Sequence, residues 1–412
     1  MIDGIPSPAI NPLDPACARD PYPIFERLRQ RNPIHHDDVM NAWLITSFDA
    51  FVQVIQDPRF SVDVCEWEAY EPATHRDLMR FRAIDDANLF SLPQTDHRRV
   101  RRLVSKAFTP RAVRELAATI DSIVDDCLAR VRPAGRLDLV SDLADAFPTY
   151  VISRLIGIPA NSRRERRFKE LADVVLAQAS PLLPMGERIA AIPLREEFFG
   201  LVDECIEERR RAPKDDILSG LLHAEEEGKR LAREELLALL SGLITAGSET
   251  TASALALGVR ELLHQPDQLV LVRQHPELRP RAAEELLRHQ MPGYFAMRVP
   301  TEDVVIEGRE IRHGQLVLPS IAAAHRDPAR FADPDRVDVT RDLSEAALFG
   351  RGPHSCLGAQ LARLELSIAY GKLVDELPGL RLGCAYDEVP FAAHPLIRSV
   401  ASLPLEFDAH SA

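Results

Sequence analysis

The sequence predicts a mainly α-helical fold with small β-sheets, an α+β class. From Arg98 to about Leu380 most windows place apolar residues at i, i+3, i+4 and i+7, the spacing of amphipathic helices. Short β-prone runs interrupt this pattern at Val304–Ile306 and Leu316–Pro319. No glycine- and serine-rich linker, charge block or repeat divides the 412 residues, so we expect a single domain over residues 1–412.

The amino-acid composition and charge are typical of a globular protein and argue against nucleic-acid or membrane partners. Apolar residues make up 46% and charged residues 27%, as in globular proteins with a sizeable core. The net charge of -13 argues against a nucleic-acid partner. Six scattered cysteines without a CxxC pair suit a reducing cytoplasm. Neither the first residues nor any later run is apolar over the roughly 20 residues that a membrane span needs, so we expect no membrane association.

The N-terminal part predicts one short helix and a hairpin. The helix covers Tyr22–Arg31, and two apolar bursts, Pro33–His36 and Ala42–Ile45, follow it as strands. Further along the chain, the predicted helices are Ala112–Val131, Leu139–Leu155, Pro193–Arg211, Arg233–Leu263, Pro280–His289 and Ala359–Val374.

The longest predicted helix, Arg233–Leu263, is weakened at its centre. Gly242 and Gly247 each cost about 1 kcal/mol relative to alanine in a helix interior. Serine and threonine beside them can bond back to the carbonyl four residues earlier and bend the axis. Such a helix makes room for a bound group, although tolerated small-residue packing and a helical hairpin are alternatives.

A glycine-rich loop precedes the last helix and contains Cys356. The run F-G-R-G-P-H-S-C-L-G occupies positions 349–358. A helix N-terminus favours a thiolate, and Gly350, Gly352 and Gly358 let backbone amides approach its sulfur. A buried structural thiol is the simplest alternative, and a zinc site would need partner ligands at short spacing.

This loop resembles the haem-binding segment of cytochromes P-450, F-G-x-G-x-H-x-C-x-G, at every fixed position. The resemblance implies haem b as cofactor and O2 as co-substrate, with Cys356 as the axial ligand of the iron. It implies that Phe349 packs beside the sulfur, that His354 reaches a haem propionate and that Gly358 belongs to the cofactor-binding loop. The fold it implies is the triangular prism of that family, with a long central helix over the haem.

A second motif lies in the weakened helix. Residues 246–251 read A-G-S-E-T-T and resemble the oxygen-binding segment A-G-x-[D/E]-T-T of the same family. The resemblance places Ala246 against the haem, assigns oxygen binding to Thr250 and assigns a proton relay from solvent to Glu249. Cleavage of the O–O bond requires such protons.

Other motifs follow the family pattern in the same order. Glu285 and Arg288 match E-x-x-R and share one helix face. In the family this pair is buried and joined by an arginine, a place that Arg336 fits. We expect this triad to be structural. The family usually has phenylalanine where this chain has Val337, so packing beside the triad is expected to be looser.

Three further basic residues match positions that bind haem propionates in the family. His97 and Arg101 match H-x-x-x-R on one helix face, and Arg298 lies six residues after Pro292. A guanidinium suits a carboxylate because it binds in a bidentate fork.

A basic run predicts the electron-transfer partner. The residues from His97 to Arg111 include five arginines and a lysine but no acid, and Arg351 and Arg363 are expected to join them. We expect this surface to dock a separate ferredoxin or flavodoxin, reduced by its own reductase, because complementary charge accelerates encounter. A solvated helix face is the alternative. A monomer is the default state of the family.

The substrate is expected to be a bulky, hydrophobic small molecule. By resemblance the pocket is lined by Phe90, Leu243, Tyr294, Phe295, Met297, Leu396 and Ile397. The run from Leu89 to His97, with Glu66 and Trp67 before it, is similar to macrolide-tailoring members of the family, which favours a polyketide-like secondary metabolite.

We therefore predict a haem-thiolate monooxygenase that hydroxylates or epoxidises its substrate. Two alternatives are a family member that catalyses isomerisation, dehydration or ring formation, and a haem-binding sensor without turnover. Glu249 and Thr250 favour oxygen activation over both.

Overall fold

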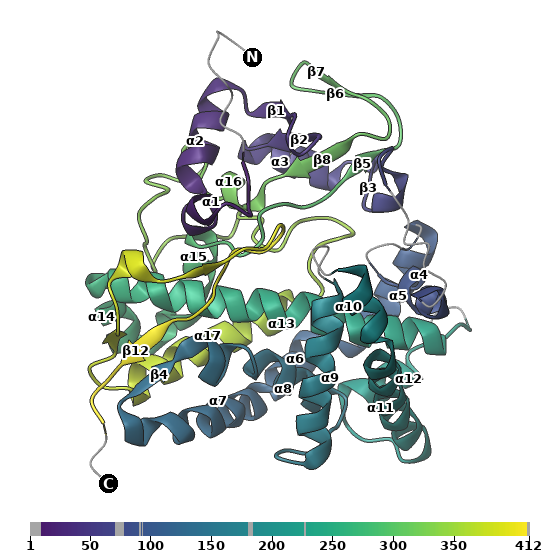
Figure 1. Cartoon of the computed structure of the whole chain (residues 1–412), viewed down its shortest axis with the longest axis vertical. Coiled ribbons are helices and arrows are strands. Elements are labelled where there is room, and N and C mark those ends of the chain that lie inside the picture. Colours follow the sequence, from purple (N-terminus) through teal and green to yellow (C-terminus); the bar gives the residue numbers. More distant parts are fainter. Residues whose placement is uncertain are drawn as a thin grey trace.

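Helices make up most of the computed structural model, which describes residues 10–70, 78–89, 92, 94–179, 184–225 and 228–409 (Figure 1). The helices are α1 (Pro15–Arg19), α2 (Tyr22–Arg31), α3 (Phe48–Gln56), α4 (Arg82–Asp86), α5 (Gln94–Ala107), α6 (Pro110–Glu115), α7 (Ala117–Val131), α8 (Phe147–Leu155), α9 (Arg163–Ala179), α10 (Met185–Ala190), α11 (Ile192–Arg211), α12 (Ile217–His223), α13 (Arg233–His264), α14 (Pro266–Gln274), α15 (Arg279–His289), α16 (Ile321–Ala324) and α17 (Ala359–Glu376).

The strands are short and form small sheets. They are β1 (Ile34–Asp37), β2 (Ala42–Ile45), β3 (Phe60–Ser61), β4 (Arg136–Asp138), β5 (Val299–Pro300), β6 (Val304–Ile306), β7 (Arg309–Ile311), β8 (Leu316–Pro319), β9 (Arg381–Leu382), β10 (Phe391–Ala392), β11 (Ser399–Val400) and β12 (Pro404–Glu406). The sheet orders are β1-β2-β8, β4-β12-β9, β3-β5, β6-β7 and β10-β11. The predicted α+β class is confirmed.

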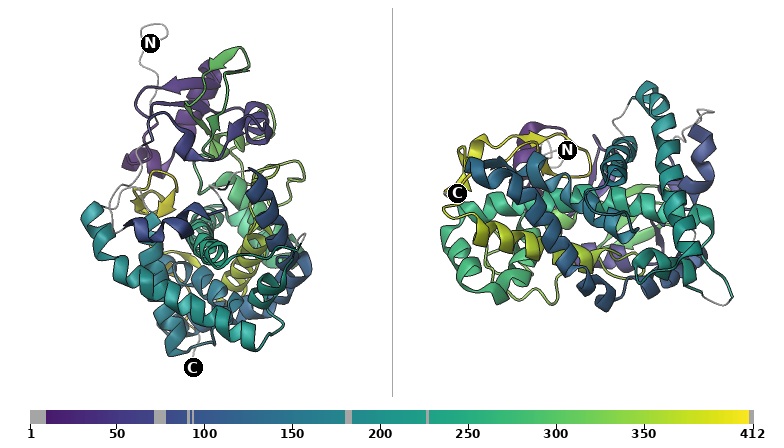
Figure 2. Two further views of the ribbon diagram at one scale, coloured as in Figure 1. Left: turned by 90° about the vertical axis from the view of Figure 1, so that its right-hand side faces the viewer. Right: turned by 90° about the horizontal axis from the view of Figure 1, so that it is seen from below.

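The N-terminal hairpin is completed by a strand from far along the chain. β1 and β2 pair antiparallel, and β2 pairs in parallel with β8, from Ala42 opposite Leu316 to Ile45 opposite Pro319. All four residues of β8 are buried, as expected for a strand that is covered on both faces. Figure 1 and the left view of Figure 2 place this sheet region at one end of the molecule and the helical region at the other.

The long helix α13 crosses the middle of the helical region, with α17 and α15 packed against it (Figure 1). Close packing depends on a glycine, because a Cβ on Gly258 would collide with the Tyr370 hydroxyl. That hydroxyl donates to the Ala254 carbonyl at 2.9 Å. The buried side chains of α13 concentrate in its C-terminal half.

Two predicted helices are interrupted. Ala112–Val131 is divided at Leu116 into α6 and α7, and Leu139–Leu155 comprises a π-helical turn at Val140–Ala144 followed by α8. The apolar periodicity continues across both interruptions, so it gave no sign of them. Among the described helices, none combines the length and apolar character needed to cross a membrane.

Candidate active site

The loop before α17 is shaped around Cys356. Gly350 and Gly352 have φ of 72° and 79°, a left-handed backbone that glycine adopts without strain. The Cys356 amide donates to the Phe349 carbonyl at 2.8 Å, which closes the loop. The Gly358 amide donates to the Cys356 sulfur. Of the predicted approach of backbone amides to this thiol, the structure shows one amide, that of Gly358.

The thiol itself is reached by solvent but surrounded by protein. Part of the Cys356 residue is exposed to solvent. The surrounding protein still raises the pKa of its thiol, because burial disfavours the charged thiolate. The Gly358 amide and the charges of Arg101 and Arg363 lower the same pKa and favour the thiolate, the form that binds metals. Among the described residues no group of three or more His, Cys, Asp and Glu side chains could hold a metal ion, so Cys356 lacks the partners of a zinc site.

Four basic side chains gather beside this loop. The rings of His97 and His354 lie 4.0 Å apart between centroids. Arg101 donates to the Ser355 carbonyl at 2.7 Å, and Arg298 is 9% exposed and donates to the carbonyl of its neighbour Met297. Within the described part of the chain, none of the four forms an ion pair with an acid.

The electrostatics of this basic cluster (His97, Arg101, Arg298 and His354) call for an anionic ligand. Burial lowers the pKa of every member, to about 10 for Arg298 and about 4 for His354. His97 Nδ1 is also buried without a hydrogen-bond partner. The guanidinium groups of Arg101 and Arg298, which no acid among the described residues compensates, lie beside the Cys356 loop. This arrangement fits haem b, which carries carboxylates and takes an axial sulfur ligand.

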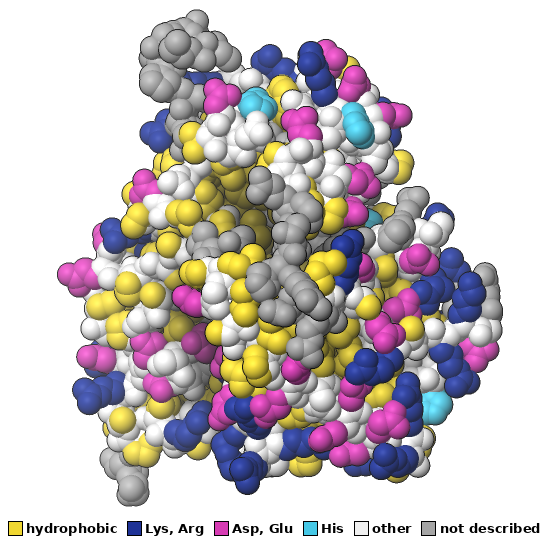
Figure 3. Space-filling model, turned by 45° about the vertical axis from the view of Figure 1, so that its right-hand side comes forward, with side chains coloured by type: hydrophobic (Ala, Val, Ile, Leu, Met, Phe, Trp, Pro, Cys, Tyr) yellow, Lys and Arg dark blue, Asp and Glu magenta, His cyan; other side chains and the backbone are white. Residues whose placement is uncertain are grey.

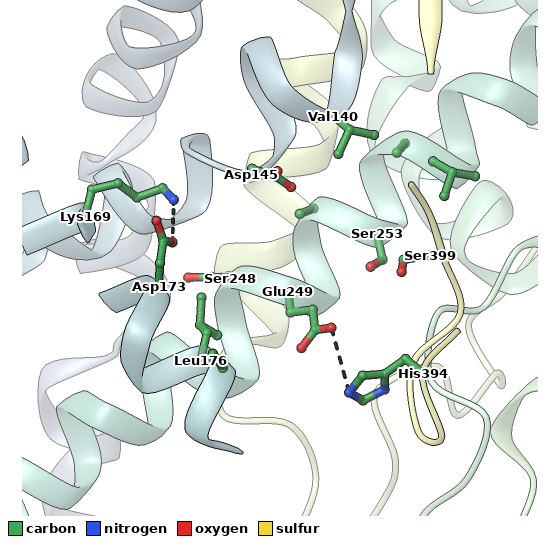
Figure 4. A pocket seen from close by; sticks show the side chains of 14 residues that line it. Val140, Asp145, Lys169, Asp173, Leu176, Ser248, Glu249, Ser253, His394 and Ser399 are labelled. Atoms are coloured by element: carbon green, nitrogen blue, oxygen red, sulfur yellow. Dashed lines mark hydrogen bonds and ion pairs between the residues drawn. The ribbon is translucent and has the colours of Figure 1, made fainter. Parts of the chain in front are cut away.

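The centre of α13 contains the second motif. Ala246 is exposed, whereas Ile244 and Ser248 on either side are buried. The Thr250 hydroxyl donates to the Ala246 carbonyl, the bond four residues back that the sequence indicated. Glu249 is partly exposed and points instead toward His394, with 4.0 Å between Glu249 Oε1 and His394 Nε2 (Figure 4).

Glu249 and His394 line a pocket of about 370 Å³ beside α13 (Figure 4). The charged residues on the other side of the pocket are Asp145, next to the π-helical turn, and the ion pair Lys169–Asp173 on α9. Lys169 Nζ and Asp173 Oδ1 are 2.5 Å apart. Burial raises the pKa of Asp145, and the Lys169 charge lowers it. The remaining lining residues are Val140, Leu176, Ala177, Ser248, Ala252, Ser253, Ala256, Ser399 and Val400.

The E-x-x-R pair is fully buried, but its third member differs from the expected one. Arg288 donates to both Glu285 oxygens at 2.7 and 2.8 Å, and both side chains are 0% exposed. Arg341 donates to Glu285 Oε1 at 3.3 Å. Arg336 is exposed and contributes only its carbonyl to Arg288. The triad is therefore corrected to include Arg341, because the loop turns the Arg336 side chain outward.

The predicted substrate-pocket residues have different environments. Tyr294 is 1% exposed and belongs to the core, so its expected role in the lining is corrected. The alternation along this extended segment buries Tyr294 and leaves Phe295 partly exposed. Leu396 is 38% exposed. Leu243, Met297 and Ile397 are also partly exposed, and Phe90 lies outside the described residues. Figure 3 shows a hollow in one face of the molecule with hydrophobic side chains within it.

The predicted basic surface is partly neutralised. Arg98, Arg102 and Lys106 are exposed at intervals of four along α5. Arg99 pairs with Glu235, Arg111 with Glu115 and Arg363 with Glu284. The Arg363 guanidinium also lies 4.4 Å from the centre of the Phe349 ring, which links this surface to the cysteine loop.

Sequence reasoning missed two groups beside the α13 motif. Glu365 on α17 is 3% exposed, hydrogen-bonds Thr251, and has its pKa raised by burial to about 8. His394 comes from the loop between β10 and β11. Neither belongs to a local pattern, and only the inward face of α17 could have indicated Glu365.

Comparisons with known proteins agree with this geometry. The family model for cytochrome P-450 matches residues 52–277 and 273–377. The chain is 36% identical over 396 residues to the epothilone C/D epoxidase of Sorangium cellulosum, covering 95% of this chain and 93% of that protein. It is 35% identical over 398 residues to the vitamin D(3) 25-hydroxylase of Pseudonocardia autotrophica, covering 96% and 95%. The solved structure of epothilone D-bound cytochrome P-450epoK superposes with a TM-score of 0.87 at 34% identity, covering 97% and 99%.

Proposed function

The chain belongs to the cytochrome P-450 family, and from this premise we propose the roles of its residues and the class of its substrate. The protein is a haem-dependent monooxygenase that uses O2 and receives electrons from redox partners. Bound haem supplies the iron at which O2 is reduced by two electrons and two protons, so that one oxygen atom enters the substrate and the other leaves as water.

We propose that Cys356 holds the iron and that the basic cluster binds the haem propionates. The single observation that carries this assignment is the gathering of four basic side chains, His97 and Arg298 buried and Arg101 and His354 partly exposed, without an acid partner among the described residues. Binding a carboxylate there would compensate charge that is otherwise buried at a cost. Glu285, Arg288 and Arg341 would support the fold around the site.

Glu249 and Thr250 would control the uptake of protons from solvent and their delivery to the bound oxygen. Glu249 lines the pocket beside α13 and can take up a proton there. Thr250, one residue further along the helix, carries the hydroxyl that would donate a hydrogen bond to the bound oxygen substrate. Separating proton uptake from delivery in this way limits the loss of peroxide before the substrate is oxidised.

The substrate would be a bulky hydrophobic secondary metabolite, polyketide-like in character. Partly exposed apolar side chains at Leu243, Phe295, Met297, Leu396 and Ile397 support this proposal. The names of the two relatives, an epothilone epoxidase and a vitamin D(3) hydroxylase, favour the same class. Hydroxylation and epoxidation are both compatible with this lining.

We further propose that a ferredoxin or flavodoxin docks over α5 and the cysteine loop, where Arg98, Arg102 and Lys106 are exposed. A monomeric state, a single domain over residues 1–412 and a cytoplasmic location stay predictions of the sequence.

A reconstituted reaction tests the proposed function. The holoenzyme, a ferredoxin, its reductase and NADPH are incubated under isotopically labelled O2 with a panel that includes epothilone D and vitamin D3. We expect at least one panel compound to gain a labelled oxygen atom. A product that is isomerised, dehydrated or cyclised without label would instead support the non-insertion alternative.

A further inference from the structure

His394 reaches the acid of the α13 motif from a distant part of the chain. It lies between β10 and β11, whereas Glu249 lies at the centre of α13, and both line the pocket in Figure 4. Their side chains are 16% and 37% exposed, so the contact is at the boundary between pocket and protein. The Thr250 hydroxyl donates to Ala246, and within the described residues Glu249 Oε1 faces His394 Nε2.

Backbone amides determine which nitrogen of His394 carries the proton. The amides of Leu396 and Ile397 both lie against His394 Nδ1, at 3.1 and 3.0 Å. An amide N–H can only donate, so Nδ1 must accept and is unprotonated. The neutral ring therefore carries its hydrogen on Nε2, the nitrogen directed at Glu249.

The other charged residues that line the pocket, among those that the structure describes, do not offer Glu249 an equivalent donor. Asp145 and Asp173 are acids and repel a carboxylate. Lys169 is paired with Asp173 at 2.5 Å. The distance between His394 Nε2 and Glu249 Oε1 is 4.0 Å, so a small side-chain rotation would bring the two atoms within hydrogen-bond distance.

We propose that His394 is a positioning residue that holds the Glu249 carboxylate in the orientation facing this pocket, so that the pocket is the proton entrance of the enzyme. This inference rests on the proposed role of Glu249. The Nε2–H of His394 donates toward the carboxylate while solvent in the pocket protonates it. Rotation of Glu249 away from His394 then carries the proton toward Thr250. His394 does not itself lose a proton in this sequence.

Two substitutions separate the contact with Glu249 from the shape of the loop. In His394→Asn the side-chain oxygen can still accept from the amides two and three residues later, as in an Asx turn, but the side chain is too short to reach Glu249. In His394→Gln the side-chain amide can extend to Glu249 and donate as Nε2–H does. Both replacements are polar and neutral.

The experiment measures coupling, the fraction of NADPH electrons recovered in product, with the best substrate of the panel above. We expect His394→Asn to lower coupling about threefold, with more peroxide and a larger solvent isotope effect, because proton uptake slows. His394→Gln is expected to retain most of the coupling. Glu249→Gln is expected to lose more, and adding His394→Asn to it should change nothing further.

A spectroscopic readout is independent of turnover. In the reduced, carbon monoxide-bound holoenzyme, ring ¹⁵N shifts of His394, assigned by their loss in His394→Asn, should report an unprotonated Nδ1 and a protonated Nε2. The Nε2 shift should move in Glu249→Gln while the Nδ1 shift stays, since only Nε2 is directed at the carboxylate.

The outcomes distinguish this inference from the proposed function. Normal coupling and isotope effect in His394→Asn, together with impaired Glu249→Gln, would overturn the role of His394 and leave that of Glu249. Normal coupling in Glu249→Gln would overturn the relay itself. Equal loss of coupling and of substrate affinity in His394→Asn and His394→Gln would show that the ring only shapes the loop, which also overturns the inference.

Discussion

Two clusters of charged and titratable side chains in this molecule differ in how their charges are compensated. The Glu285 carboxylate accepts hydrogen bonds from Arg288 and Arg341. Arg288 also donates to the carbonyls of His325 and Pro334 at 2.8 Å. The basic cluster has no acid among the described residues, and one nitrogen, His97 Nδ1, has no partner. A cluster whose donors and acceptors are matched stabilises the folded chain, whereas a largely enclosed cluster without matching acids indicates a site for a ligand of the missing charge.

The largest expected effect comes from breaking the balanced cluster. Arg288→Ala leaves Glu285 buried at 0% exposure without its main partner, and removing one partner of a buried pair costs about 3–5 kcal/mol. We expect little soluble holoprotein, measured as haem content per polypeptide. Normal haem content in this variant would contradict the structural role of the cluster.

Glu365 sharpens the comparison because it is a buried acid that has no basic partner within the part of the chain that the structure describes. Burial raises its pKa from 4.5 to about 8, so the folded chain holds a proton that the unfolded chain releases. The resulting stability is fully present below pH 4.5 and is lost as the pH rises toward 8. Between pH 6 and 8 the wild type should lose about 2 kcal/mol through this group, at about 1.4 kcal/mol per pKa unit.

Glu365→Gln should remove this dependence, because glutamine carries no titrating proton. Denaturant unfolding at both pH values measures it, with the exposed Glu310→Gln as control. An unchanged pH dependence in Glu365→Gln would mean that the carboxyl is ionised in the fold.

The unbalanced cluster should respond differently from the balanced one. Arg298→Met removes a buried charge that has no acid partner in the described ranges, so the free energy of unfolding should not fall. Haem retention should suffer, because a charge-assisted bond to a carboxylate is lost, and haem should transfer to apomyoglobin about tenfold faster, equivalent to about 1.4 kcal/mol. The exposed Arg312→Met serves as control. An unchanged transfer rate would remove Arg298 from the haem site.

The smallest effect tests the corrected member of the triad. Arg341→Met should lower the free energy of unfolding by about 1 kcal/mol, because its guanidinium contacts a fully buried carboxylate. Arg336→Met should stay within about 0.5 kcal/mol of wild type, since that side chain is exposed. The reverse order in a denaturation experiment would restore the original prediction.

The same contrast explains what could be predicted from the sequence. The cysteine loop and the Glu285–Arg288 pair depend on residues close together in the chain, so their spacing indicated their geometry. Arg341 replaces Arg336 because a loop turns, and periodicity carries no information about loop direction. His394 and Glu249 are distant in sequence and meet only in the folded chain. Tyr294 is buried beside a partly exposed Phe295, a distinction that depends on which face of a short extended segment packs inward.

The most direct test of the central claim is the carbon monoxide difference spectrum of the dithionite-reduced holoenzyme, wild type beside Cys356→Ser. Thiolate ligation by Cys356 predicts a strongly red-shifted Soret band in the wild type and its loss in the variant. An unshifted, histidine-like band from freshly prepared wild type, or the same red-shifted band from Cys356→Ser, would contradict the assignment of Cys356 as the iron ligand.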